Sequence, residues 1–389
     1  MPASRWNFNQ IRQPLIYSVP FPFLVIVPVI LAILTIITLF IRSDVNAALL
    51  WSQCHSRSIL PGLSVIPGFG TPLCYLVSFF QVAVDSLRGA ATLAAILAFI
   101  GGLLTVSTVE AARVCNAPNV VIAYPTGPWL VFNLVGGAVV WELLIIPVFL
   151  YWSKMRLQFG RRPADPESIA EAAAETEDEN HDEAAESYEK KDRHLAITET
   201  VAIPTSVALG FFVPSVAVLA TASPWAIGIW LFFPIYVSAV RQLVRWITKR
   251  THFTTARHVH LESNRWSLII VYAVPIACSV LAHIFIIWNM TTRDDRKEMA
   301  RSVVRFIEID AAFIGLTVLY WMLIEVGWRV PLVMIASAIV VGPGAGICLG
   351  WMYRERLIHQ GIPQQDELPN NVEQANSAEE PDETTPLMR

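Results

Sequence analysis

Residues 129–152 read WLVFNLVGGAVVWELLIIPVFLYW, an apolar run that contains one charged residue, Glu142. A helix needs about 20 predominantly apolar residues to cross the hydrocarbon core of a bilayer, and this run is long enough. Trp129 and Trp152 close its two ends, as expected for indole rings at the level of the lipid headgroups. The run therefore predicts a membrane-spanning helix with a carboxyl group near or a little beyond mid-depth.

The same apolar pattern recurs along the chain. Eight further candidate spans are 18–41, 66–84, 89–109, 201–222, 225–240, 266–290, 306–328 and 330–353. The chain is 54% hydrophobic and only 15% charged, whereas soluble domains are about a quarter charged. This composition excludes an ordinary soluble domain. We expect an all-α integral membrane bundle of eight or nine transmembrane helices.

The acidic residues are concentrated in two stretches that are not apolar. Of the 32 Asp and Glu residues, 12 lie in 163–193 and 7 lie in 360–389. Such stretches bury too little apolar surface to fold by themselves. The predicted organisation is an N-terminal segment 1–17, a four-helix membrane half 18–152, an acidic flexible linker 153–199, a four- or five-helix membrane half 200–353, and an acidic disordered tail 354–389.

The basic residues lie at the ends of the apolar runs and form no continuous face, which excludes a nucleic-acid partner. Two basic connections, which follow residues 152 and 240, are expected on the cytosolic side of an endomembrane such as the endoplasmic reticulum. If each predicted span crosses the membrane once, these cytosolic connections put Glu110, Glu308 and Asp310 in the lumenal half. Asp85 and Glu325 then lie at the other face. The connection 291–305 carries five bases and conflicts with this count.

Glu142 is the strongest candidate for a catalytic residue. An ionisable group inside a membrane costs free energy, so its presence indicates a functional or structural role. Burial disfavours its charged form, so that a protonated Glu142 would be a proton donor. The alternative is a structural glutamate, hydrogen-bonded to a neighbouring helix through Asn133 or a backbone carbonyl.

Other candidates lie in the run 306–328. Glu308 and Asp310 are separated by about 200° around a helix, so they cannot both face one cavity. Tyr320 and Trp321 in this run, and Trp141 beside Glu142, have ring faces that can stabilise a cation in a substrate. The alternative for each ring is packing against other helices or lipid.

Metal and thiol sites have little support in the sequence. Residues 294–298, DDRKE, resemble the aspartate-rich run that binds magnesium diphosphate, but no second acidic motif accompanies them, and a solvated loop is favoured. The five cysteines show no metal-ligand spacing and are interpreted as packing thiols, with a Cys54–Cys115 disulfide as the alternative. No metal or other cofactor is predicted.

The carboxylate in residues 117–152, APNVVIAYPTGPWLVFNLVGGAVVWELLIIPVFLYW, together with the chain length and span number, resembles the membrane-bound terpene cyclases of fungal meroterpenoid and indole-diterpene clusters. This resemblance implies an enzyme that protonates an epoxide or alkene of a lipophilic, prenylated precursor and guides cation cyclisation, with no release of diphosphate. Glu142 would be the acid, Asp310 or Glu308 a second carboxylate, and Trp141, Tyr320, Trp321 and Asn133 would line the substrate site.

Two other classes of function remain open. A proton-coupled transporter of a hydrophobic metabolite would use the same carboxylates as proton carriers. A non-catalytic membrane protein would instead gather other pathway enzymes through its acidic linker and tail.

Overall fold

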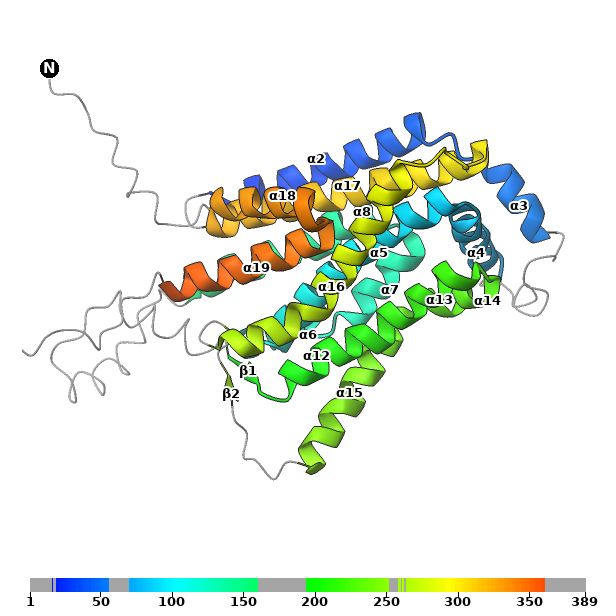
Figure 1. Cartoon of the computed structure of the whole chain (residues 1–389). Coiled ribbons are helices and arrows are strands. Elements are labelled where there is room, and N and C mark those ends of the chain that lie inside the picture. Colours follow the sequence, from blue (N-terminus) through cyan, green and yellow to red (C-terminus); the bar gives the residue numbers. More distant parts are fainter. Residues whose placement is uncertain are drawn as a thin grey trace, which may run out of the picture.

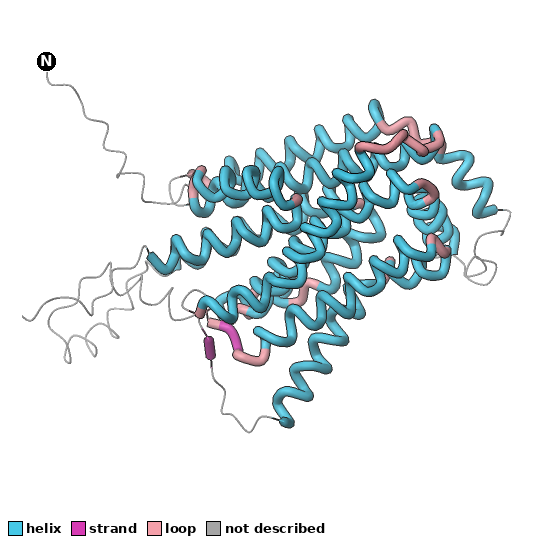
Figure 2. The backbone as a smooth tube through the Cα atoms, viewed as in Figure 1, coloured by secondary structure: helices cyan, strands magenta, loops and turns pink. Residues whose placement is uncertain are grey.

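The structure, a computed structural model, describes residues 16, 19–55, 70–159, 194–251, 258–259, 261 and 264–360. In these parts the chain is helical almost throughout, and its long helices pack side by side in one bundle (Figure 1). The exception is a short antiparallel pairing of β1 (Leu195–Ala196) with β2 (His258–Val259), drawn in magenta in Figure 2. The predicted all-α class is confirmed. Most of the predicted N-terminal segment, acidic linker and acidic tail lie outside the described residues.

Six helical stretches of the described chain are long and apolar enough to cross a membrane. They are α2 (Phe21–Arg42), α5 (Leu87–Ala112), Gly137–Met155, Glu199–Thr221, α16 (Arg265–Met290) and α17 (Glu298–Val326). A seventh crossing results if α14 (Pro224–Trp230) and α15 (Phe233–Thr251), which meet at 59°, form one bent span. The count of eight or nine is therefore not confirmed for the described residues.

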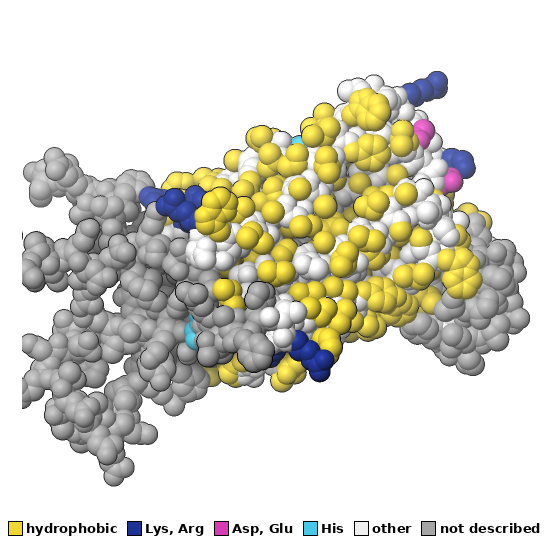
Figure 3. Space-filling model, turned by 60° about the horizontal axis from the view of Figure 1, so that its bottom comes forward, with side chains coloured by type: hydrophobic (Ala, Val, Ile, Leu, Met, Phe, Trp, Pro, Cys, Tyr) yellow, Lys and Arg dark blue, Asp and Glu magenta, His cyan; other side chains and the backbone are white. Residues whose placement is uncertain are grey.

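The outer surface of the bundle matches a lipid environment. Many large apolar side chains are exposed on α2 and α16, including Phe23, Ile33, Phe40, Leu281 and Ile284. Figure 3 shows apolar side chains over most of one face, with Lys and Arg side chains near its ends. Such a belt would be unfavourable in water but is the expected boundary with acyl chains.

Helix α5 lies at the centre of the bundle and packs against α16 and α19 (Pro343–Gln360). Small residues permit this close approach, as is usual between membrane helices. A methyl group on Gly344 of α19 would lie 2.3 Å from the carbonyl oxygen of Ala98, and one on Gly102 would lie 2.8 Å from the carbonyl oxygen of Gly344. The backbones of α5 and α19 therefore touch at this point.

Gly136 breaks the predicted span 129–152 into two limbs that fold back on each other. The first limb is α7 (Thr126–Val135), and the second is α8 (Gly137–Val140), the π-helical turn η4 (Trp141–Ile145) and α9 (Ile146–Phe159). Gly136 has φ 150°, which favours glycine. The rings of Trp129 and Trp141 are 5.9 Å apart, although 12 residues of straight helix would place them about 18 Å apart. The prediction of one continuous helix is wrong.

The start of the first limb and the end of the second limb of this hairpin lie at the same end of the bundle. Helix α7 packs against η4, and α9 returns to pack against α6 (Val120–Ala123), which precedes α7. Trp152 of α9 also donates its ring N–H to the carbonyl of Cys115, in the short helix η3 (Val114–Asn116) that follows α5. The chain therefore enters the bundle and leaves it on one side.

The last predicted span, 330–353, is a second hairpin. Gly342, with φ 97°, separates α18 (Arg329–Val341) from α19. A methyl group on Gly346 would lie 2.8 Å from a carbon of Ala338, and one on Gly350 would lie 2.0 Å from Met334. These contacts show that the two limbs run antiparallel with touching faces.

The two hairpins change which charges share an end of the bundle. Because α7 to α9 turn back, Glu110 at the end of α5 lies at the same end as Glu325 at the end of α17, and both contact Arg354 of α19. Asp85 lies at the opposite end, where it pairs with Lys297. The predicted grouping of Glu110 with Glu308 and Asp310 is therefore wrong. We call the two ends the Arg354 end and the Asp294 end.

A disulfide joins two helices near the Asp294 end. Cys54 of α3 (Ala47–His55) is bonded to Cys74 of α4 (Gly70–Val84), whereas Cys115, Cys278 and Cys348 form no disulfide within the described residues. The alternative pairing of Cys54 with Cys115 is wrong, because Cys115 follows α5 at the Arg354 end. The interpretation of all five cysteines as packing thiols is also wrong for Cys54 and Cys74.

Candidate functional site

Glu142 lies at a point where three helical elements meet. It belongs to the π-helical turn η4, its side chain has no exposed surface, and it faces α2 and α17. The hydroxyl of Thr35 lies 3.2 and 3.1 Å from its two carboxyl oxygens, and the hydroxyl of Thr317 lies 3.2 Å from Oε1. Glu142 is therefore held by hydroxyl groups from both neighbouring helices.

The hydrogen bonds of Thr35 and Thr317 are compatible with a protonated Glu142. Thr35 Oγ1 also lies 2.9 Å from the carbonyl of Leu31, and Thr317 Oγ1 lies 2.9 Å from the carbonyl of Phe313. A hydroxyl has one hydrogen to donate and two lone pairs to accept with. A threonine that donates to its own helix can only accept from Glu142. A neutral carboxylic acid, with its one hydrogen, can donate to one of the two threonines while the other donates to it.

No basic side chain pairs with Glu142 within the described part of the chain, where its side chain is hydrogen-bonded to the hydroxyls of Thr35 and Thr317. Asp310 of α17 accepts the backbone N–H of Ala138 at 2.9 Å and so binds the first turn of α8. A methyl group on Gly137 would lie 2.6 Å from the other oxygen of Asp310. The glycine thus allows the carboxylate to approach the start of the helix, where exposed N–H groups favour negative charge.

Glu308 is not part of this site. Its side chain is exposed on α17, whereas Asp310 is half-buried against α8. This agrees with the expectation that the two carboxylates point in different directions. The structure brings Asp310, and not Glu308, to the hairpin that carries Glu142.

The predicted aromatic residues lie around the site but are packed. Trp141 is fully buried and its ring centre lies 6.4 Å from that of Phe132. Trp321 packs against Phe149 and Trp351, with ring centres 4.7 and 4.9 Å away. Tyr320 donates its hydroxyl to the carbonyl of Leu24 at 3.0 Å. These rings form part of the core in this structure.

Asn133 is bound elsewhere. Its amide donates to the carbonyl of Leu231, at the junction of α14 and α15, at 2.7 Å. It is therefore not the partner of Glu142 that the sequence suggested. The partners are Thr35 and Thr317, which the sequence does not single out because they are distant in the chain and hydroxyl residues are common in membrane helices.

A pocket of about 300 Å³ opens at the Arg354 end, between α5, the segment around α6 and α7, and α15. Glu142 does not line it. Trp129 forms part of its wall, and its ring centre lies 5.9 Å from that of Trp141. The side chain of Trp129 therefore contacts both the pocket and the hairpin limb that carries Glu142.

A buried ion network at the same end was not predicted. Arg354 contacts Glu110, Glu325 and Glu355, and Arg113 contacts Glu110 and Glu355. Both arginines are almost fully buried. Three carboxylates surround two guanidinium groups, so the network joins the ends of α5, α17 and α19. The sequence signal is the charged run in residues 354–356 directly after an apolar stretch.

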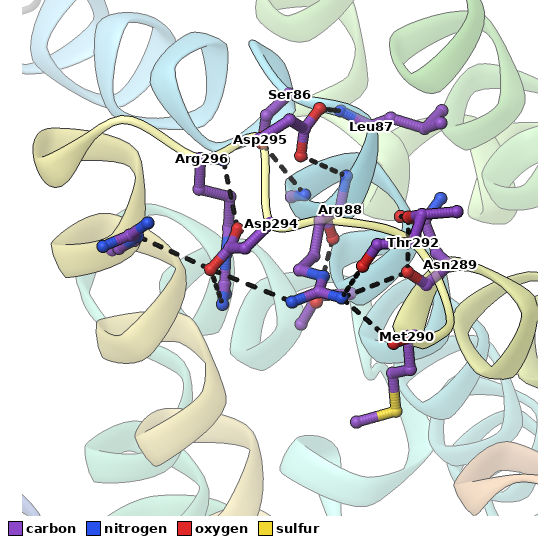
Figure 4. A network of polar contacts seen from close by, with 12 residues as sticks. Ser86, Leu87, Arg88, Asn289, Met290, Thr292, Asp294, Asp295 and Arg296 are labelled. Carbon is purple, nitrogen blue, oxygen red and sulfur yellow. Dashed lines mark hydrogen bonds and ion pairs between the residues drawn. The ribbon is translucent and has the colours of Figure 1, made fainter.

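The acidic run at residues 294–298 has a structural role at the Asp294 end (Figure 4). Asp295 accepts the backbone N–H groups of Leu87 and Arg88 at 2.7 and 3.2 Å, at the start of α5. Asp294 binds Arg296 at 3.0 Å and also contacts Arg88 and Arg301. These aspartates are bound to protein groups, which favours the interpretation as a structural loop over a diphosphate site.

No group of three or more His, Cys, Asp or Glu side chains in the described residues is arranged to hold a metal ion. Arg88 of α5 also donates to the carbonyls of Asn289, Met290 and Thr292. The connection 291–305, whose five bases conflicted with the predicted span count, is thus bonded to the start of α5.

Comparison with known proteins gives one family. No curated protein and no solved structure matches the chain. The model of the CtvD domain matches residues 66–294, which include the Gly136 hairpin, Glu142 and the pocket between α5 and α15. This match covers more than half of the chain. The chain therefore belongs to the CtvD domain family, a family from fungal secondary-metabolite clusters.

Proposed function

We propose that this protein is a membrane-bound terpene cyclase that protonates an epoxide or alkene of a lipophilic, prenylated precursor in a fungal secondary-metabolite pathway. The observation that carries the proposal is the environment of Glu142. This carboxyl group is fully buried, bound by two threonine hydroxyls and without a basic partner in the described chain. General acid catalysis needs a group of this kind.

The proposed reaction uses this acid once per cycle. Glu142 gives its proton to the epoxide oxygen, and the carbon–oxygen bond breaks. The electron pair of an alkene in the same substrate then forms a carbon–carbon bond to the electron-poor carbon. The resulting cation loses a proton to a carboxylate, either Glu142 itself or Asp310, and in the second case the proton passes back from Asp310 to Glu142 before the next cycle. Trp141, Tyr320 and Trp321 would stabilise the cation through their ring faces.

The proposal requires the hairpin to open. Glu142 is enclosed by α2, η4 and α17, so a substrate reaches it only when these elements separate. Gly136, at the turn between the two limbs, is a suitable hinge because its φ/ψ conformation is accessible mainly to glycine. A lipophilic substrate would enter from the acyl chains through the surface between α2 and α17.

We place the Arg354 end on the cytosolic side of an endomembrane such as the endoplasmic reticulum. Lys154 and the basic residues at the end of α15 lie at this end, in agreement with the preference of positive residues for the cytosol. The Cys54–Cys74 disulfide lies near the opposite end, and disulfides persist in oxidising compartments. Two independent features thus support the same orientation.

The test is a conversion assay in microsomes that contain this protein and no other pathway enzyme. An epoxidised prenyl precursor is supplied, and products are measured by chromatography and mass spectrometry. Glu142→Gln, which preserves size and hydrogen bonding but has no acidic proton, should reduce conversion by at least about a hundredfold. Glu308→Gln is the matched control, because Glu308 is exposed. Equal conversion by the Glu142→Gln variant and the unmodified protein would refute the assignment.

A proton-coupled carrier of a hydrophobic metabolite is the second candidate. The two hairpins, which turn at Gly136 and Gly342, are broken helices of the type that transporters use near the midplane. A carrier would move the precursor across a sealed vesicle without altering it. Recovery of unchanged precursor inside the vesicles, dependent on a pH gradient, would favour the carrier over the cyclase.

A further inference from the structure

We propose that the pocket at the Arg354 end is a binding site for an amphiphilic anion, a molecule with one carboxylate or phosphate group on an apolar body. This inference concerns a different place from Glu142 and does not depend on the proposed cyclase activity. It rests on the lining of the pocket, the charge balance in its wall and its position at the end of the bundle.

The pocket has a polar side and an apolar side. Leu104 of α5, Trp129 of α7 and Val237 of α15 supply apolar surface, and all three are buried. The polar side includes four side chains from the middle of α15, among them Arg241 and Arg245. A volume of about 300 Å³ is at the lower end of the range for small-molecule sites. Such a lining suits a molecule with one polar end.

The charge on the polar side is positive. Three arginines, Arg113, Arg241 and Arg245, line the pocket, and none of the described residues that line it is acidic. Arg113 is paired with Glu110 and Glu355 behind the wall. Arg241 and Arg245 share a single carboxylate: their Nε atoms lie 2.9 and 3.1 Å from the two oxygens of Glu199. Two guanidinium groups facing one carboxylate leave one positive charge in excess.

The geometry leaves that charge available to a ligand. Glu199 lies behind the arginines, with 4% of its side chain exposed, whereas the side chains of Arg241 and Arg245 are 12% and 34% exposed. The carboxylate thus fixes the two guanidinium groups from one side, and their remaining N–H groups can donate from the other. A fixed pair of planar donors is well suited to a carboxylate or phosphate.

The position also fits an amphiphile. The last turn of α15 carries Lys249 and Arg250, which marks this end as the level of the headgroups if the bundle spans a bilayer. The apolar wall of Leu104 and Trp129 lies deeper in the bundle. The anionic group would therefore bind at the arginines while the apolar body extends toward Trp129.

The test measures ligand binding to the full chain by native mass spectrometry in a neutral detergent. Four probes separate the contributions: oleate, oleate methyl ester, phosphatidic acid and inorganic phosphate. We expect one-to-one complexes with oleate and phosphatidic acid, and the tighter of these two identifies the preferred anionic group. The uncharged ester and the tail-less phosphate should bind at least about tenfold more weakly. Equal binding of the ester, or of inorganic phosphate, would overturn the proposal.

Three variants assign the binding to this pocket. Arg245→Gln should weaken oleate binding about tenfold, the size of one charge-assisted hydrogen bond. Lys249→Gln removes the same charge from the same helix outside the lining and should leave binding within twofold. Glu199→Gln removes the internal competitor and should tighten binding, a gain that misfolding cannot produce. Equal losses in Arg245→Gln and Lys249→Gln, or no gain in Glu199→Gln, would indicate non-specific attraction and overturn the assignment.

Discussion

Ala138 of α8 donates its backbone N–H to the carboxylate of Asp310 in α17 across 2.9 Å, and this bond fixes the turn of the hairpin that carries Glu142. Asp310 is 13 residues into α17 and meets a chain segment more than 170 positions earlier. The contact links the broken helix to a continuous one. The same helix α17 also carries Thr317, which contacts Glu142.

We predict that Asp310→Ala lowers the stability of the protein by about 1 kcal/mol, the usual effect of losing a side-chain cap at a helix start. Asp310→Asn keeps a carbonyl acceptor for Ala138 and should lose less than half of that. Thermal unfolding in detergent measures both. If the two variants are equally stable, the hydrogen bond does not stabilise the hairpin.

The close contact between α5 and α19 predicts that one methyl group added at Gly344 destabilises the protein. Gly344→Ala would place a carbon 2.3 Å from the carbonyl oxygen of Ala98, so the two helices must separate. We expect a loss of about 1–3 kcal/mol from overpacking. Gly127→Ala, at a position with no atom within 4 Å of the new methyl group, is the control and should be neutral. Similar unfolding temperatures for the two variants would contradict the close approach.

The ion network at the Arg354 end predicts a larger effect. Arg354→Gln removes the arginine that contacts Glu325 and one of the two arginines that contact Glu110 and Glu355, all in a buried site. We expect a loss of roughly 3–5 kcal/mol, which is typical when one partner of a buried ion pair is removed. Arg329→Gln removes an exposed charge near the same end and should change stability by less than about 0.5 kcal/mol. The fraction of each variant that remains folded after heating, compared with the unmodified protein, measures both effects.

The loop at the Asp294 end predicts a pH dependence. Hydrogen bonds from Arg296 lower the pKa of Asp294 from 3.8 to about 2. Because the folded pKa is lower than the unfolded one, the contribution of Asp294 to stability is fully present above about pH 4 and disappears as the pH falls through 2.

The measurement is the difference in unfolding temperature between the unmodified protein and Asp294→Asn, taken at several pH values. The difference should be constant above pH 4 and shrink toward pH 2. A difference that does not change with pH would mean that the carboxylate of Asp294 is not held by its arginines.

The proposed orientation predicts which cysteine substitutions react in sealed microsomes. Lys249→Cys at the Arg354 end should react with a membrane-impermeant maleimide from outside. Lys297→Cys, whose native side chain is 81% exposed at the opposite end, should react only after detergent is added. Both variants are made in a background in which Cys115, Cys278 and Cys348, which form no disulfide in the described chain, are replaced by Ser. The reverse pattern would invert the orientation.

The amino-acid sequence by itself determined the all-α class of the protein and several of its long apolar helices. Hydropathy is a local property, so runs such as 18–41 and 266–290 appear in the structure as α2 and α16 with similar bounds. The sequence also identified Glu142 as a charged residue in an apolar run, because the cost of such a group does not depend on its partners.

Only the tertiary structure decided how those segments turn and what the charged groups contact. Gly136 and Gly342 look like ordinary glycines in apolar runs, but packing against α17 and α5 makes each the corner of a hairpin. Thr35, Thr317 and Arg354 meet their partners across distant positions in the chain. Such contacts depend on how the helices pack together, and composition along one segment carries no information about its neighbours in space.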